Sequence, residues 1–218
     1  NHRMKSLSFM RREAINWILI LLPLICLIFV HDNLPRFAPF PVNSEQNIFY
    51  LLMFNFCVSI LVYSKLLIKP VIDPKTTLHS NLRTLHRFKT LILFFISLLS
   101  LSYISQKLGI PLNWTKIGFI AAMLFITVLG NLYPTLKHNY FVGLKNAWTL
   151  SDELIWNRTH RFAGKVFFWG GLAGTIYGIF FNVTIVPYMP AISVGYVFGL
   201  VLIPHIYSYI LHRKLQVH

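Results

Sequence analysis

Long apolar runs alternate with short polar connections along most of this chain. Each run is close to the ~20 residues that an α-helix needs to cross an apolar layer of about 30 Å. The runs do not alternate apolar and polar residues, as the strands of a membrane β-barrel do. The pattern therefore predicts an all-α, polytopic membrane protein with six transmembrane helices. The expected spans are about residues 14–30, 48–68, 90–105, 117–132, 163–181 and 191–211.

The composition supports a membrane protein and weakens a nucleic-acid interpretation of the charge. Only 12% of the residues are charged and the mean hydropathy is +0.60, whereas a soluble domain carries about 25% charge. The formal net charge is +14, but no nucleic-acid motif accompanies it. Contact with anionic lipid is the expected role of the basic residues. Cys26 and Cys57 both lie in apolar runs, which predicts buried apolar side chains rather than a disulfide or a metal pair.

The distribution of lysine and arginine predicts the topology. With the N-terminus, the second and fourth connections and the C-terminus on one side, 17 of the 20 basic residues lie there. Arg36, Lys107 and Lys116 are left for the other side. Cytoplasmic segments of membrane proteins carry such an excess. Both termini and the fourth connection are therefore expected in the cytoplasm.

The chain divides by position into two membrane parts. Residues 1–105 hold three expected spans, with an outer loop at 31–47 and a short amphipathic helix at 76–88 lying on the membrane. Residues 106–218 hold the other three spans and a polar cytoplasmic loop at 133–162. Small residues recur every fourth position in the last two spans and predict close helix packing. These residues are Gly170, Gly174 and Gly178 in the fifth span and Gly195 and Gly199 in the sixth.

The stretch from Asn139 to Arg161 is the only segment of the second half that is polar, aromatic and charged at once. Thr149 or Ser151 is placed to cap a helix that begins near Asp152 and continues into the fifth span. Acidic residues at positions 152 and 153 suit the positive end of that helix. Helical spacing puts Glu153, Trp156 and His160 on one face.

This stretch favours recognition over catalysis. Glu153 and His160, with His138, are the candidate metal ligands or acid–base groups. No HExxH motif, nucleophile elbow or pair of facing carboxylates accompanies them. We therefore expect no enzyme activity, no catalytic residue, no metal and no cofactor, and we interpret the stretch as a surface for a partner or ligand.

The same stretch resembles the signature of the SdpI family of bacterial multi-pass membrane proteins. The resemblance rests on Asn139-Tyr-Phe-Val-Gly143, Trp148-Thr-Leu-Ser151, Glu153, Trp156, Thr159-His-Arg161 and Gly164, with Gly130, Asn131 and Pro134 before them. It extends over about residues 117–211 and is strongest over 130–164. The outer loop at 31–47 departs from the family, since it contains prolines and His31 but no glycine.

The resemblance implies a location and a function. Members lie in the bacterial plasma membrane, and the type member protects a toxin-producing cell from its own secreted antimicrobial peptide. It also acts as a receptor that draws a transcriptional repressor to the membrane. The implied partners are the lipid bilayer, a peptide toxin and a cytoplasmic transcriptional regulator, without direct contact to nucleic acid.

We therefore expect an immunity or signal-transducing membrane protein. The residues expected to bind a partner or ligand are Asn131, Asn139, Tyr140, Gly143, Trp148, Thr149, Glu153, Trp156, Thr159, His160 and Arg161. A small-molecule or ion transporter is the alternative, with Asn55, Thr127 and the region of Pro204 and His205 as polar groups within the spans. A membrane enzyme built on Glu153 and His160 is the third interpretation.

Overall fold

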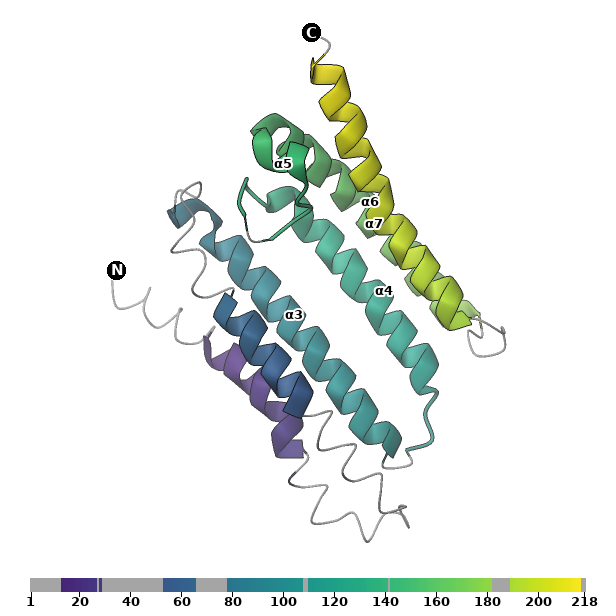
Figure 1. Cartoon of the computed structure of the whole chain (residues 1–218). Coiled ribbons are helices and arrows are strands. Elements are labelled where there is room, and N and C mark those ends of the chain that lie inside the picture. The colour runs from purple at the N-terminus through teal and green to yellow at the C-terminus, as the bar shows by residue number, and fades with distance from the viewer. Residues whose placement is uncertain are drawn as a thin grey trace. The chain divides into compact units, whose positions relative to one another are not determined.

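The computed structural model describes residues 13–26, 28, 53–65, 78–107, 110–140, 142–181 and 189–216. Within these ranges the chain is helical and has no β-strand. The expected outer loop at 31–47 lies outside the described residues. The elements are the helices Glu13–Cys26 and Met53–Lys65, α3 (Leu78–Lys107), α4 (Trp114–Leu132), the 3-10 turn η1 (Tyr133–Thr135), α5 (Ala147–Ser151), α6 (Glu153–Phe180) and α7 (Met189–Gln216). Figure 1 labels α3 to α7.

Three of the described helices are long and apolar enough to cross a membrane. The three candidate spans are Thr84–Gln106, Trp114–Thr135 and Ala191–Leu215. The helices Glu13–Cys26 and Met53–Lys65 are shorter and apolar. The helical, membrane-type fold is therefore confirmed, while the number of six spans and the side of the termini stay predictions.

α3 differs from the sequence prediction. An amphipathic helix over 76–88 and a separate span from residue 90 were expected, because Leu78, Leu82, Leu85 and Phe88 follow helical spacing within a basic connection. The structure has one continuous helix from Leu78 to Lys107. No proline or glycine occurs within it to interrupt the backbone hydrogen bonds, so the change from basic to apolar residues takes place inside a single helix.

The chain packs as two units. One unit takes the described residues within Asn1–Leu67 and Lys89–Trp114, and the other takes those within Ile68–Phe88 and Thr115–His218. In the first unit one face of α3 is buried, and it combines two apolar residues with two serines: Leu93, Ser97, Ser100 and Ile104. A cavity of about 10 Å³ lies between this face and Asn55, Ser59 and Ile20. That volume is about enough for one water molecule.

An ion pair between the buried Lys89 and the half-buried Glu13 joins the described helices of the first unit. Lys89 is 1% exposed, and its Nζ donates to both carboxylate oxygens of Glu13 at 2.8 and 2.9 Å. The hydroxyl of Tyr63 donates to the same carboxylate at 2.8 Å, and the ammonium lies 4.5 Å from the centre of the Tyr63 ring. Beside them, Thr90 donates to Asn16 at 2.8 Å. Every charge in this cluster has a partner, as burial requires.

In the second unit, glycines allow α4 and α6 to approach until their backbones touch. A Cβ added at Gly130 of α4 would lie 2.3 Å from the backbone nitrogen of Phe168 and 2.8 Å from the carbonyl of Gly164. On α6, a Cβ added at Gly171 would meet the backbone of Thr127 at 2.6 Å. Side chains cannot fit at these positions, so small residues decide the packing of this helix pair.

The five glycines expected in helix packing have different surroundings. Gly174 and Gly178 face α4, where an added Cβ would meet Met123 and Phe119, respectively. Gly170 faces α7, with Leu200 at 2.4 Å from an added Cβ. At Gly195 and Gly199 of α7, an added Cβ has no described neighbour within 4 Å. α6 and α7 thus pack through Gly170 and Leu200, and the glycine face of α7 is open.

Candidate functional site

The region between α4 and α6 is built from short elements with local caps. α4 ends in η1, which has Pro134 near its start. At α5, the side chain of Asn146 accepts from the Thr149 amide at 2.9 Å, and the Thr149 hydroxyl accepts from the Asn146 amide at 3.0 Å. This reciprocal capping box satisfies two backbone donors that would otherwise have no partner.

Asp152 is the residue that caps α6. Its carboxylate accepts from the amides of Leu154 and Ile155 at 2.6 and 3.0 Å. α6 begins next to Asp152 and continues through the fifth apolar run, as the sequence predicted. The expected caps Thr149 and Ser151 do not serve α6, because both residues belong to the separate helix α5.

Asn139 closes the loop before α5. The residue is fully buried, and its amide nitrogen donates to the carbonyls of Lys137 and Val142 at 2.8 and 3.1 Å. Its side-chain oxygen accepts from the Val142 amide at 2.8 Å. One side chain therefore replaces the missing regular backbone hydrogen bonds of the loop.

Trp156 and His160 form the centre of the region. Both project from α6, are 0% and 1% exposed, and stack with ring centroids 3.9 Å apart. His138 packs on Trp156 at 5.1 Å, and Tyr133 stacks on His160 at 5.6 Å. The indole Nε1 donates to the carbonyl of Leu136 at 2.9 Å. The stack thereby ties η1 and the loop to the first two turns of α6.

Both ring nitrogens of His160 are used in hydrogen bonds. Nε2 accepts from the Leu144 amide at 3.1 Å, so the proton is on Nδ1, which donates to the carbonyl of Trp156 at 2.8 Å. Burial, together with nearby His138, lowers the pKa of His160 to about 4 despite the bond to Trp156. A second proton on Nε2 would face the Leu144 N–H, so the ring is held neutral.

Gly143 lets the loop pass over this stack. Its φ of +132° is a conformation that L residues with a side chain rarely adopt. An added Cβ would lie 2.4 Å from Nε2 of His160 and 2.9 Å from the Trp156 ring. The glycine is therefore required both by its backbone conformation and by the close approach that brings the Leu144 amide to His160.

The chain is similar in sequence to known proteins. Residues 135–208 match the model of the SdpI/YfhL protein family. We refer to residues 135–208 as the SdpI-like region. The chain is also 26% identical over 159 residues to the protein named Immunity protein SdpI from Bacillus subtilis (strain 168), covering 72% of this chain and 76% of that one. No solved structure matches the chain. The resemblance read from the signature residues is thus confirmed.

The structure separates the SdpI-like signature residues into a buried group and an exposed group. Trp148 and Gly143 are half-buried. The buried group is Asn139, Thr149, Trp156, Thr159 and His160, and the exposed group is Asn131, Tyr140, Glu153 and Arg161. The buried residues hold the region together, and the exposed ones, with their neighbours, form its surface. Glu153 does not join Trp156 and His160, although all three were expected on one face.

α7 completes the SdpI-like region in a way that the sequence did not indicate. Trp148 stacks on His212 and packs on Tyr209, with ring centroids 5.4 Å away in both cases. The Asn146 side chain donates to the Ser208 hydroxyl at 2.7 Å. Figure 1 shows α5 beside the C-terminal part of α7. The only signals in the sequence were the polar Ser208 and the two rings of Tyr209 and His212 within the apolar helix α7.

The candidate metal ligands do not come together. Glu153 is exposed, and both nitrogens of His160 are occupied by backbone groups. In the part of the chain that the structure describes, no three His, Cys, Asp or Glu side chains are grouped so that they could hold a metal ion. The chemistry of this region is hydrogen bonding and aromatic packing.

The neutral state of His160 predicts a pH dependence of stability. Its pKa is about 4 in the folded protein against 6.5 in the unfolded chain. The unfolded state therefore binds more protons as the pH falls from 6.5 to 4, and about 3 kcal/mol of stability should be lost over that range. Denaturation of the detergent-solubilised protein at several pH values measures this loss. His160→Gln should flatten the profile, whereas His205→Gln should keep it, and equal slopes in both variants would contradict the assignment.

Gly143→Ala should destabilise the SdpI-like region by about 2 kcal/mol or more. The methyl group forces a strained φ, which costs on the order of 1–3 kcal/mol, and displaces His160. Gly118→Ala is the matched control, because Gly118 lies within α4 with no described atom near an added Cβ. There alanine should stabilise the helix by roughly 0.5–1 kcal/mol. In thermal unfolding, the melting temperature should fall for Gly143→Ala and rise for Gly118→Ala.

Proposed function

We propose that this chain is an integral membrane immunity protein of a bacterial plasma membrane, conferring resistance to an antimicrobial peptide toxin. In this proposal it has six spans, both termini lie in the cytoplasm, and its action is binding rather than catalysis. The observation that carries the proposal is the similarity to Immunity protein SdpI over 72% of the chain. The matched family region adds support, because its signature residues form the packed centre described above.

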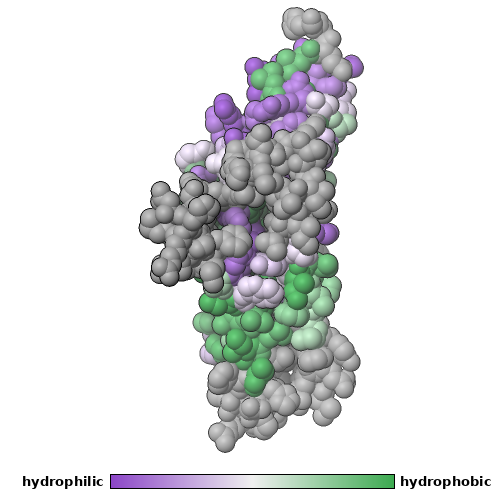
Figure 2. Space-filling model, turned by 90° about the vertical axis from the view of Figure 1, so that its left-hand side faces the viewer, coloured by the Kyte–Doolittle hydropathy of each residue, from purple (hydrophilic) through white to green (hydrophobic). Residues whose placement is uncertain are grey.

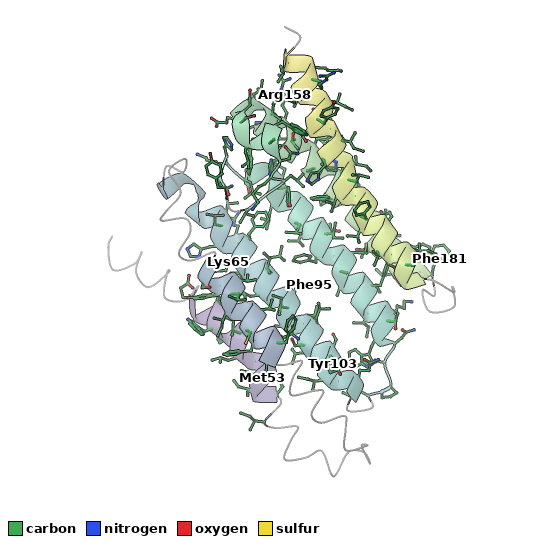
Figure 3. The ribbon with its side chains drawn as sticks, in the orientation of Figure 1. Met53, Lys65, Phe95, Tyr103, Arg158 and Phe181 are labelled. Atoms are coloured by element: carbon green, nitrogen blue, oxygen red, sulfur yellow. The ribbon has the colours of Figure 1, made fainter. Side chains whose placement is uncertain are left out.

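The exposed face of α6, opposite the buried stack, is the proposed site for a cytoplasmic regulator. Arg158, Arg161 and Lys165 are exposed and follow one another at helical spacing along α6. Leu154 is 45% exposed one turn before Arg158. Figure 3 shows Arg158 and Phe181 near opposite ends of α6, and Figure 2 shows hydrophilic residues gathered at the C-terminal end of the second unit. A basic row beside an exposed leucine suits an acidic partner surface with an apolar contact.

Resistance is tested by expression in a peptide-sensitive host. Cells carrying the wild-type chain should survive a peptide concentration that kills cells with an empty vector. Trp156→Ala should lose this protection, because it removes the centre of the SdpI-like region. Trp169→Ala, at a 65% exposed position of α6, is the matched control and should protect. The abundance of each variant in the membrane is measured in parallel. If cells carrying the wild-type chain are killed by every antimicrobial peptide tried, the proposal is refuted.

Regulator recruitment is tested separately from resistance. RNA abundance is compared with and without a sublethal peptide dose. The wild type should show a peptide-induced set of transcripts. Arg158→Glu with Arg161→Glu should abolish this induction while survival is unchanged, because the substitution reverses the surface charge and leaves the buried stack intact. Unchanged induction in this variant would show that the basic row does not contact the regulator.

A further inference from the structure

An apolar groove of about 420 Å³ opens in the second unit at the end opposite α5. Its lining is mostly apolar and aromatic and comes from three helices: Phe119 of α4, Ala173, Gly174 and Tyr177 of α6, and Ile192, Ser193 and Tyr196 of α7. α4 and α7 contain candidate membrane spans. The groove therefore lies where apolar helix surfaces reach the end of a membrane-crossing segment.

Its walls are aromatic rings held by their neighbours. Tyr177 stacks on Phe181 with centroids 4.9 Å apart and meets Phe119 edge-on at 6.4 Å. The Tyr196 hydroxyl donates to the carbonyl of Gly170 at 2.8 Å, so this residue turns its ring rather than its polar group to the groove. A polar ligand would find few partners here, whereas a hydrocarbon chain would contact rings on several sides.

A cation lies close in sequence to residues that line this apolar groove. Lys116 is one helical turn before Phe119 on α4, and its Nζ donates to the carbonyl of Ile179 at 3.0 Å, just past Tyr177. Figure 3 shows Phe181 at this end of α6. A lysine near the end of a span reaches the level of the lipid headgroups. The arrangement places one positive charge near the apolar groove.

We propose that the groove binds one glycerophospholipid, with an acyl chain along the aromatic walls and the phosphate at Lys116. The apolar lining matches the chain, and the lysine matches the charge of the phosphate. The bilayer supplies this ligand at high concentration, so modest affinity is enough for occupancy. The inference does not depend on the proposed immunity function, since it uses only the groove and Lys116.

Native mass spectrometry of the protein purified in non-ionic detergent tests the proposal. The probes are phosphatidylglycerol and, without a phosphate, a diacylglycerol with the same chains. The wild type should retain one phosphatidylglycerol. Ala173→Phe fills the groove and should lower retention about tenfold. Val194→Phe, at a 70% exposed position of α7 outside the groove lining, should retain lipid as the wild type does.

The headgroup contact has its own variant. Lys116→Gln should weaken phosphatidylglycerol binding about fivefold, as expected for one basic residue near anionic lipid, and leave diacylglycerol unchanged. Equal retention by the wild type and Ala173→Phe would overturn the groove assignment. Equal loss of both lipids in Lys116→Gln would overturn the phosphate contact. Retention of an added apolar peptide in place of either lipid would overturn the choice of ligand.

Discussion

Replacing Lys89 by Met is expected to destabilise the first unit by about 3–5 kcal/mol, although methionine is the better residue for an apolar helix. The substitution leaves the Glu13 carboxylate with Tyr63 and Asn16 but without its cation. Removing one partner of a buried ion pair typically costs this much, because the remaining charge has lost its compensation in a medium that solvates it poorly. The loss should exceed that of any surface substitution in the same unit.

Three variants distinguish the ion pair from a general effect of charge. Lys65→Met removes an exposed lysine and should change stability by less than about 0.5 kcal/mol. Glu13→Leu combined with Lys89→Met removes both charges and should recover most of the loss, since a paired apolar replacement leaves no charge behind. Thermal unfolding in detergent and hydrogen exchange of the Glu13–Cys26 amides measure these effects. A double variant as unstable as Lys89→Met would contradict the pairing.

Trp156→Ala is expected to destabilise the SdpI-like region by about 3–5 kcal/mol. The substitution opens a cavity beneath fully buried rings, which costs this amount in well-packed cores. It also removes the donor for the Leu136 carbonyl and one stacking partner of both His138 and His160. Phe88 and Leu136, which belong to the same buried cluster, lose their central contact.

Hydrogen exchange locates this effect. Amides from 136–140 and 142–146 should exchange much faster in Trp156→Ala, because the loop they belong to is held by the Trp156 and His160 side chains. Trp169→Ala is again the matched control: its ring is 65% exposed on the same helix, and exchange in the loop should not change. Protection of the loop in Trp156→Ala would mean that Asn139 and the α5 cap hold it without the stack.

Much of the fold could be predicted from the sequence, because the strongest signals are local. The apolar runs gave the helices, and Asp152 before an apolar-periodic stretch gave the beginning of α6. The break expected between residues 88 and 90 was wrong, because charge alone does not end a helix when proline and glycine are absent. The short helix α5 was not predicted, since its capping box uses Asn146 and Thr149, residues that equally suit a turn.

The candidate site was predicted in position but not in arrangement. Helical spacing correctly put Trp156 and His160 on one face of α6. Spacing did not show that this face is covered, because the covering groups come from η1 and the loop, up to 27 residues away in sequence for Tyr133 and His160. For the same reason the sequence assigned Lys89 to a basic connection, whereas its partner Glu13 is 76 residues distant. Long-range pairs of this kind leave no periodic pattern.

The backbone contact between α4 and α6 restricts how the second unit can change shape. A shift of α4 by one helical turn, about 5.4 Å, would bring the side chain of Ile126 to the place where Gly130 now meets Phe168. Sliding of α4 along α6 is therefore blocked, and the two helices move together as one rigid body. Any rocking motion within this unit has to be taken up by α7, which retains open space along Gly195 and Gly199.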